Sequence, residues 1–420
     1  MKNKEGETML EVIEPDYMAE FSCNGLLCPD TCCSGWEIVI DEATCERYEK
    51  SHNAEFKATL SRAIVHRKET TKDGEHDVAC IRMGKGNRCL FLCNDGLCMI
   101  QRKTEEKNLS KTCRTYPRML YLWQDAYAER SLCVSCPAAA HLILGRKKPL
   151  HFVTKKIEAA ELDGLRITDE GQRLESDCLP LRRFLLEILQ ERNLSLPRRL
   201  QLANEFFWQA GAIAGHHAEK KFHRLLVRYQ QKLREEGGVP EAAIVARKTI
   251  IARKLEAMQR LFFHRLQNPE LRLDFRQRLA AALAHWRLKA EEPISQKSIE
   301  QYTEDEEFYQ IVFLPEYSEV LENYLVNGVF KNIFITEDGT PFYQEWFQLL
   351  VQFSIAKALL IVSMTENPKG IVQEQVIETI QKTSRAIGHD GLYLQQMANQ
   401  FAAKQPAEDA LRDFCNKMLA

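Results

Sequence analysis

The sequence lacks an excess of charge of either sign. It has 57 lysines and arginines against 59 aspartates and glutamates, which gives a formal net charge of -2. A dedicated nucleic-acid binder needs a strongly basic surface, so this balance argues against that class. The expected partner is a protein or a small molecule.

An apolar leader is also lacking. Residues 1–17 include several acidic side chains and no apolar run, so they resemble neither a secretory signal nor a transit peptide. The most apolar later stretch, residues 347–364, is interrupted by polar residues such as Gln352 and Lys357, which fits a buried helix better than a membrane span. We therefore expect a cytoplasmic protein without a membrane span.

Familiar catalytic motifs are missing as well. The sequence contains no G-x-G-x-x-G after a strand, no P-loop, no G-x-S-x-G and no H-E-x-x-H. Because these motifs are absent, they give no indication of which reaction the protein would catalyse.

Cysteine, by contrast, is abundant. Twelve of the 14 cysteines fall between Cys23 and Cys136, and only Cys178 and Cys415 lie beyond them. A chain without a secretion signal keeps its thiols reduced, so bound metal explains them better than disulfides do. The composition predicts a cysteine-rich metal-binding domain over residues 1–150 and a second domain over residues 151–420.

Helical periodicity dominates the second domain. Apolar residues recur at helical spacing from about Leu179 onward. Helices are expected over 198–235, 240–267, 271–289, 306–326, 342–365 and 372–387. The first segment has turn-rich pieces between short apolar runs instead. The predicted fold is mostly α, with a loop-rich, cysteine/metal-binding N-terminal region packed on a multi-helix C-terminal domain.

The cysteines form three sets along the chain. The sets are Cys23, Cys28, Cys32 and Cys33; then Cys89, Cys93, Cys98 and Cys113; and finally Cys133 and Cys136. Zinc sites use paired knuckles of short spacing, which the first set does not show. Iron–sulfur clusters take four thiolates at wider and less regular spacing, so we favour iron–sulfur and keep zinc as the alternative.

Several cysteines have a simpler interpretation. Adjacent side chains in extended backbone point to opposite faces, so Cys32 and Cys33 do not easily reach one small ion together. One of them is left for a second metal, a redox role or burial. For Cys45 and Cys80 we expect burial, since free cysteine is among the most buried residue types.

Charged and aromatic residues accompany the thiols. Arg114 and Arg118 flank a stretch close to Cys113, where a guanidinium would stabilise an anionic cluster or bind a carboxylate, and Trp36 would shield such a site from water. A structural ion-pair role for the arginines is an equal alternative.

Four ordered segments share a specific pattern of cysteines and neighbouring residues. They are Phe21-x-Cys23 with Cys28-x-Asp30-Thr31-Cys32-Cys33-x-Gly35-Trp36, then Cys89-x-Phe91-Leu92 with Gly96-Leu97-Cys98-x-Ile100, then Thr112 to Arg118, and Ser135-Cys136-Pro137. Together they resemble the flagellin lysine-N-methylase family of motile bacteria. Leu321 to Leu325 also resembles a family segment. The resemblance plausibly extends over most of the chain.

The resemblance implies transfer of methyl groups from S-adenosylmethionine to surface lysines of flagellin, by a protein that holds a [4Fe–4S] cluster. It carries over eight possible metal ligands, twice what one cluster needs: Cys23, Cys28, Cys32, Cys33, Cys89, Cys98, Cys113 and Cys136. The chain departs from the pattern at Leu90, where proline is usual, and at Ala138, where glutamate is usual. Neither departure removes a thiol.

Methyl transfer to lysine needs a neutral amine, whereas an ordinary lysine has a pKa near 10.4. A base or a desolvating pocket is required, and the nearest side chains to Cys113 that could supply one are Tyr116, Tyr121 and Asp125. The alternative function is a non-catalytic zinc- or iron-binding protein or a redox protein.

Overall fold

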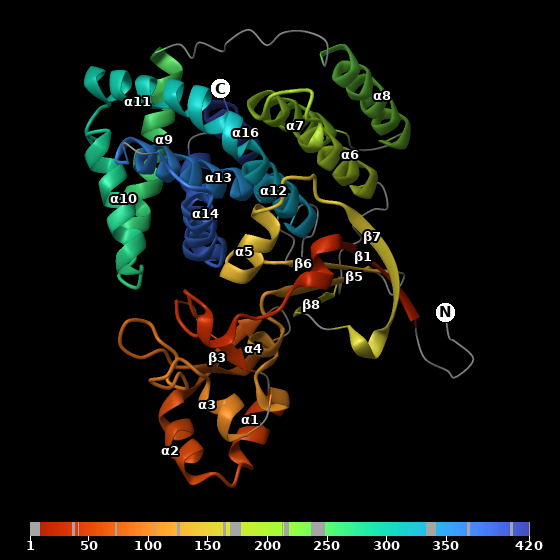
Figure 1. The fold of residues 1–420 in the computed structure, drawn as a ribbon, viewed down its shortest axis with the longest axis vertical. Coiled ribbons are helices and arrows are strands. Elements are labelled where there is room, and N and C mark those ends of the chain that lie inside the picture. The colour runs from red at the N-terminus through yellow and green to blue at the C-terminus, as the bar shows by residue number, and fades with distance from the viewer. Residues whose placement is uncertain are drawn as a thin grey trace. The chain divides into compact units, whose positions relative to one another are not determined.

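The computed structural model groups the chain into two compact units (Figure 1). It describes residues 9–35, 38–40, 42–71, 74–104, 106–123, 127–162, 165–168, 178–211, 213, 218–236, 248–332, 342–367, 370–403 and 406–419. Unit 1 comprises residues 1–139, 153–167 and 270–272, and unit 2 comprises residues 140–152, 168–269 and 273–420. Residues 153–167, which the sequence analysis assigned to the second domain, thus cluster with the first unit.

Unit 1 contains eight strands among its described residues, and the sequence analysis did not predict them. The strands are β1 (Met9–Pro15), β2 (Ile38–Ile40), β3 (Ile64–Thr71), β4 (Gly74–Ile81), β5 (Arg118–Trp123), β6 (Tyr127–Leu132), β7 (Phe152–Glu158) and β8 (Leu165–Thr168). One sheet has the order β7-β1-β6-β5-β8, with β1 parallel to β6 and β5 antiparallel to it. The other has the order β2-β4-β3 and is antiparallel throughout.

The helices of unit 1 are short. They are α1 (Glu42–Glu49), α2 (Ala54–Ala63), α3 (Met99–Lys103), α4 (Lys111–Thr115) and the 3-10 turns η1 (Asp16–Glu20), η2 (Gly25–Leu27), η3 (Glu106–Asn108) and η4 (Ala159–Glu161). Side-chain caps fix where two of them begin, because the Asn53 carboxamide accepts from the Phe56 amide and the Ser110 hydroxyl accepts from the Cys113 amide. Helix α5 (Pro137–Leu144) runs across the sequence boundary of the two units.

A small aromatic core holds the second sheet and its helices together. Tyr48, Phe56 and Phe91 are fully buried, and the ring of Phe56 lies 5.5 Å from each of the other two rings. Ile38 and Ile81, on paired strands, complete the same cluster. The thiols described below pack around this core.

Unit 2 is helical throughout its described residues. Its helices are α6 (Cys178–Gln190), α7 (Leu196–Gly211), α8 (Ala218–Glu236), α9 (Lys248–Leu266), α10 (Leu273–His285), α11 (Gln296–Phe308), the π-helical turn η5 (Tyr309–Phe313), α12 (Leu314–Asn332), α13 (Phe342–Thr365), α14 (Gln373–Gly388), α15 (Gly391–Ala402) and α16 (Ala407–Leu419). The prediction of a mostly α fold with a cysteine-rich N-terminal region is confirmed.

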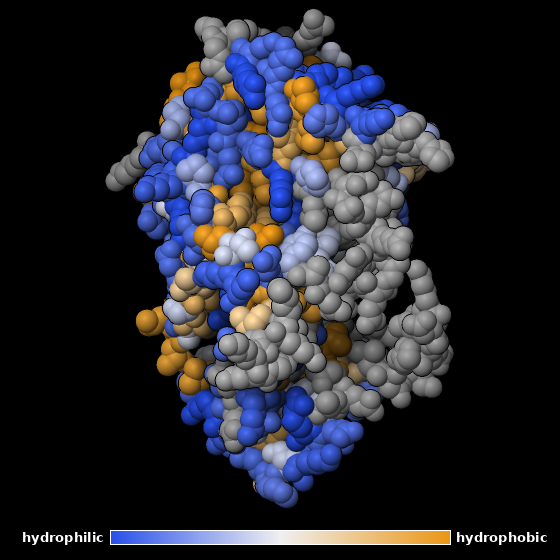
Figure 2. Space-filling model, turned by 90° about the vertical axis from the view of Figure 1, so that its right-hand side faces the viewer, coloured by the Kyte–Doolittle hydropathy of each residue, from blue (hydrophilic) through white to orange (hydrophobic). Residues whose placement is uncertain are grey.

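Helix α13 is the central apolar helix of unit 2. It is long and apolar enough to cross a membrane by composition, yet 78% of its most apolar window is buried inside the protein. Trp346, Leu350 and Leu360 are fully buried. The prediction of a buried core helix for this stretch agrees with that burial. On the face shown in Figure 2, hydrophilic residues predominate and apolar ones occur in small groups between them.

A buried amide joins three helices of unit 2. Asn204, on α7, accepts hydrogen bonds from the indole nitrogens of Trp208 and Trp346 at 3.0 and 2.9 Å and donates to the Asn416 carboxamide at 2.7 Å. It is almost fully buried. Each indole N–H would be left without an acceptor if this carboxamide were lost, and a buried unsatisfied donor is costly.

We therefore predict that Asn204→Leu destabilises unit 2 by about 2–4 kcal/mol, since two buried donors lose their acceptor. Urea unfolding followed by tryptophan fluorescence measures the change. The matched control is Gln296→Ala, because Gln296 is an exposed helical residue that bonds only its neighbour Glu300 at 2.8 Å. Equal stability of the two variants would contradict the role assigned to Asn204.

Candidate functional site

The first cysteine loop is shaped by turns within residues 23–34. Gly25 has a φ of +54°, a conformation that favours glycine, at the start of η2. The Cys28 thiol donates to the Asp30 carbonyl at 3.4 Å, and the Thr31 hydroxyl accepts from the Cys33 amide at 3.2 Å. All of these features lie within a few residues of one another, so the local sequence is enough to explain this turn.

A distant residue anchors the same loop. The Asp30 carboxylate is buried and pairs with the guanidinium of Arg272, which belongs to unit 1 although it lies 242 positions further along the chain. The sequence analysis named Asp30 only as a member of the first family motif and did not identify Arg272. An isolated arginine in a helical region gives no signal of such a contact.

The second cysteine segment pairs directly with the first. The Cys89 amide donates to the Cys33 carbonyl at 2.8 Å, and isolated bridges join Ser34 to Arg88 and Leu92 to Cys98. Between these pairs the chain makes a tight turn, in which the Cys93 amide donates to the Leu97 carbonyl at 2.8 Å. Backbone pairing therefore brings Cys33, Cys89 and Cys98 into one neighbourhood.

Cys113 joins them from the first turn of α4. Its amide is held by the Ser110 hydroxyl at 3.2 Å. We call Cys33, Cys89, Cys98 and Cys113 the Cys33 group. All four pack against the same hydrophobic core as Phe91, with Cys89 buried and the other three partly buried.

Electrostatics link every pair within the Cys33 group. Burial, opposed by local hydrogen bonds, raises the thiol pKa of Cys89 to about 12 and that of Cys113 to about 12, and repulsion from the other thiols of the group adds to the rise. The pKa of Cys98 is raised by burial and by the charge of Cys33 in the same way. Four thiols thus share a site that disfavours four uncompensated thiolates.

A second set of thiols lies around Cys136. Burial, followed by the charges of Cys28 and Cys23, raises the pKa of the Cys136 thiol to about 11. Cys32 interacts with both sets, because a hydrogen bond with Cys33, burial, and then the charges of Cys33, Cys113 and Cys23 raise its pKa. The eight cysteines named from the family motif therefore divide into the Cys33 group and a set formed by Cys23, Cys28 and Cys136, with Cys32 interacting with both.

The remaining cysteines are mostly core residues. Cys80, Cys133 and Cys415 are buried, as expected for Cys80, while Cys45 is half-buried against the aromatic core. Within the part of the chain that the structure describes, no group of three or more His, Cys, Asp or Glu side chains is close enough to hold a single metal ion. A cluster of several irons takes thiolates that are further apart than the ligands of one ion.

The other candidate residues lie beside the thiols to differing degrees. The Tyr116 hydroxyl hydrogen-bonds with the Ser135 hydroxyl at 3.0 Å, next to Cys136 in the chain. Tyr121 is buried in β5 opposite Glu129. The guanidinium of Arg118 lies 4.9 Å from the centre of the Phe21 ring.

Three more candidates have weaker structural support. Arg114 is exposed on α4. Trp36 and Asp125 lie outside the described residues. Ser110, which holds Cys113, was not identified from the sequence, and Ser135, which holds Tyr116, was named only within the motif Ser135-Cys136-Pro137. A serine directly before a helix is a common N-cap, so Ser110 could have been found.

Comparison with known proteins agrees with the motifs. A profile of the FliB lysine N-methylase C-terminal domain matches residues 182–410, more than half of the chain. The flagellar biosynthetic protein FliU of Salmonella muenchen is 31% identical over 148 residues, which are 35% of this chain and 85% of FliU. No solved structure matches the chain significantly.

Two relatives are named lysine-N-methylases. Those of Salmonella typhimurium and Salmonella choleraesuis are each 27% identical over 206 residues, or 49% of this chain. Each match covers 49% of the relative, so this chain spans about half the length of these two proteins. The family resemblance seen in the sequence is confirmed, and the chain belongs to the FliB lysine N-methylase family.

Proposed function

We propose that this protein methylates surface lysines of flagellin in the cytoplasm, with S-adenosylmethionine as the methyl donor. The observation that carries the proposal is the match of residues 182–410 to the lysine N-methylase domain. The relative FliU, named for flagellar biosynthesis, supports a flagellar substrate. The lack of a strong net charge supports a protein partner rather than a nucleic acid.

The reaction is an in-line displacement at a sulfonium methyl. The lysine amine must lose its proton, approach the methyl carbon in line with the departing sulfur, and be screened from water. For a donor bound beside the thiols, Tyr116 is proposed as the group that orients the amine, because its hydroxyl is held by Ser135 next to a cysteine of the motif. Tyr121 is proposed for the same role, although its burial in a strand gives a substrate less access.

We propose that the Cys33 group holds the [4Fe–4S] cluster. The support is the chemistry of the donor set: four thiols from three segments surround one core, and iron would supply the positive charge that compensates four neighbouring thiolates. With four protein ligands every iron is coordinated, so the bound cluster would supply loop ordering in a unit whose core is small. Arg118 lies in the same unit.

This assignment predicts that Cys113→Ser abolishes the cluster, because one of its four ligands is lost. Anaerobic purification with iron, zinc and sulfide analysis measures the result, with an expectation of about four irons and four sulfides per wild-type chain. The control is Cys45→Ser, since Cys45 packs on the same core but lies outside the family motif.

Two results would count against the assignment. Stoichiometric zinc without sulfide in the wild type would favour the alternative of a zinc-binding protein. Full iron content in Cys113→Ser, with loss in Cys136→Ser instead, would move the cluster to the second set of thiols.

The methylation itself is tested with purified components. Anaerobically prepared protein, flagellin and S-adenosylmethionine with a labelled methyl group should yield labelled N-methyl-lysine, detected by mass spectrometry of flagellin peptides. The control is flagellin whose lysines have been acetylated, which should take up no label. A cell lacking the gene should make flagellin without methyl-lysine, and unchanged flagellin mass in that cell would refute the proposal.

A further inference from the structure

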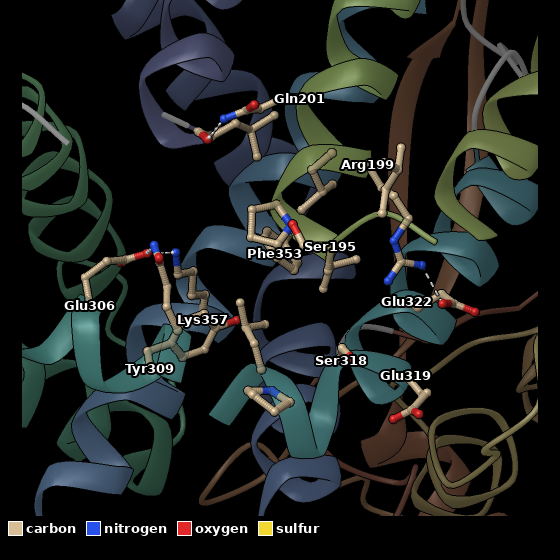
Figure 3. Close-up of a pocket in the computed structure, with 18 of the residues that line it drawn as sticks. Ser195, Arg199, Gln201, Glu306, Tyr309, Ser318, Glu319, Glu322, Phe353 and Lys357 are labelled. Atoms are coloured by element: carbon tan, nitrogen blue, oxygen red, sulfur yellow. Dashed lines mark hydrogen bonds and ion pairs between the residues drawn. The ribbon is translucent and has the colours of Figure 1, made fainter. Parts of the chain in front are cut away.

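Unit 2 contains a cavity that the cysteine chemistry does not use. Its volume is about 550 Å³, within the range of small-molecule sites, and it is lined by residues of α7, α9, α11, η5, α12, α13 and α16 (Figure 3). Apart from Met418 and Leu419, its lining residues lie inside the segment that matches the lysine N-methylase domain. The sequence analysis named none of them as a site candidate, although Glu322 lies in the family segment Leu321 to Leu325.

Two ion-paired groups line opposite sides of this cavity. Figure 3 shows Glu306 with Lys357 on one side and Arg199 with Glu322 on the other. The Glu322 carboxylate is fully buried and also accepts from Arg192, with a nitrogen–oxygen distance of 2.9 Å. These charges are compensated within the protein.

Lys254 is a further basic residue at the cavity, and it takes part in neither of these ion pairs. It lines the cavity from α9 with only 4% of its surface exposed. Within the described residues no carboxylate lies within ion-pair distance of its ammonium group, whose aromatic neighbour is the Tyr302 ring at 5.9 Å. Glu306, the carboxylate that acts on it electrostatically, is already bonded by Lys357 and by the Tyr302 hydroxyl.

The buried position of Lys254 lowers the pKa of its ammonium group. Burial, and then repulsion from Lys357, lower the pKa of Lys254 to about 8, against the opposing attraction of Glu306. Burial acts to raise the pKa of Glu306, but Lys357 and Lys254 lower it to about 2, so it stays ionised. A buried cation without a paired anion is costly to keep, and an anionic group of a ligand would relieve that cost.

The rest of the lining supplies a complementary anion and an apolar wall. Glu319, on α12, is a lining residue on the side of Glu322 and has no ion-pair partner within the described residues. Phe353 lies between the two charged sides. Tyr309 lines the cavity and is the first residue of the π-helical turn η5. Such departures from α-helical geometry are frequent at functional sites.

We propose that this cavity binds the methyl donor, S-adenosylmethionine, with its carboxylate at Lys254 and its cationic ammonium or sulfonium group toward Glu319. This inference rests on the proposed function. The surplus cation at Lys254 matches the carboxylate of the ligand, and the anion at Glu319 matches the sulfonium, which several bonds separate from that carboxylate. The apolar wall at Phe353 suits the remaining, less polar part of the ligand. A cluster with four cysteine ligands would need such a separate donor site.

The test is calorimetric binding of S-adenosylhomocysteine and S-adenosylmethionine to the full, anaerobically prepared chain. Lys254→Met should weaken binding of both roughly 10- to 100-fold, because a charge-assisted contact to the carboxylate is lost. Glu319→Gln should weaken S-adenosylmethionine more than S-adenosylhomocysteine, which lacks the sulfonium charge. The matched control is Lys289→Met, since Lys289 is exposed on the same unit and should bind as the wild type does.

Proton uptake gives a second readout. In the protein without ligand the pKa of Lys254 is about 8, so its amine is largely neutral at about pH 9. A carboxylate bound beside it raises that pKa. Binding at about pH 9 therefore adds a proton to Lys254, whereas binding at about pH 6.5 does not, because Lys254 is already protonated there. Of the groups that face Lys254, Glu306 stays ionised, and Tyr302 and Tyr309, whose pKa values are raised by burial, stay neutral at both values. Titrations in two buffers of different ionisation heat measure the uptake. The α-amino group of the ligand titrates near pH 8 and contributes equally with both proteins, so Lys254→Met should take up about one proton fewer than the wild type at about pH 9.

The outcomes separate this inference from the proposed function. If both variants bind the donor as the wild type does while flagellin is still methylated, the cavity is not the donor site and the proposed function stands. If the wild type neither binds the donor nor methylates flagellin, the proposed function fails. Should Lys254→Met fail to fold, as judged by circular dichroism, Glu319→Gln and the proton uptake of the wild type decide the question.

Discussion

The backbone hydrogen bond from the Cys89 amide to the Cys33 carbonyl joins the two halves of the cysteine region. Together with the hydrogen bond from the Gly35 amide to the Asn87 carbonyl, it sets the register between the turn-rich loop that contains Cys33 and the segment that contains Cys89. With it, the thiols of Cys33, Cys89, Cys98 and Cys113 converge on one aromatic core. Side chains that repel one another as thiolates are thus held together by backbone pairing and apolar burial, and a metal cluster would relieve the repulsion.

The sequence predicted most about features that depend on residues close together in the chain. The abundance of cysteine identified the part of the chain in which the thiols of the Cys33 group pack on one core, and the ordered motifs identified the family that the domain match supports. Spacing could not divide the eight thiols, because the division depends on which turn pairs with which. Asp30 and Arg272 show the limit most clearly, since their contact spans 242 positions and neither residue type is unusual.

In the helical half, periodicity located most helices but not their ends. The expected helix 342–365 matches α13 at both ends, whereas the stretch 198–235 is divided between α7 and α8. Helix α11 was only partly anticipated, because its sequence is rich in charge and shows a weak apolar stripe. The strands of unit 1 were missed because short apolar runs between turns do not distinguish a strand from a loop.

The contact between Asp30 and Arg272 has a consequence for how the protein is made. Domains usually fold as the chain emerges from the ribosome, N-terminal parts first. Here the loop with the first four cysteines is complete only once residue 272 has been synthesised, well past the middle of the chain. During translation the leading thiols therefore lack this ion pair, and the proposed cluster would be loaded at a late stage of synthesis or into the released protein.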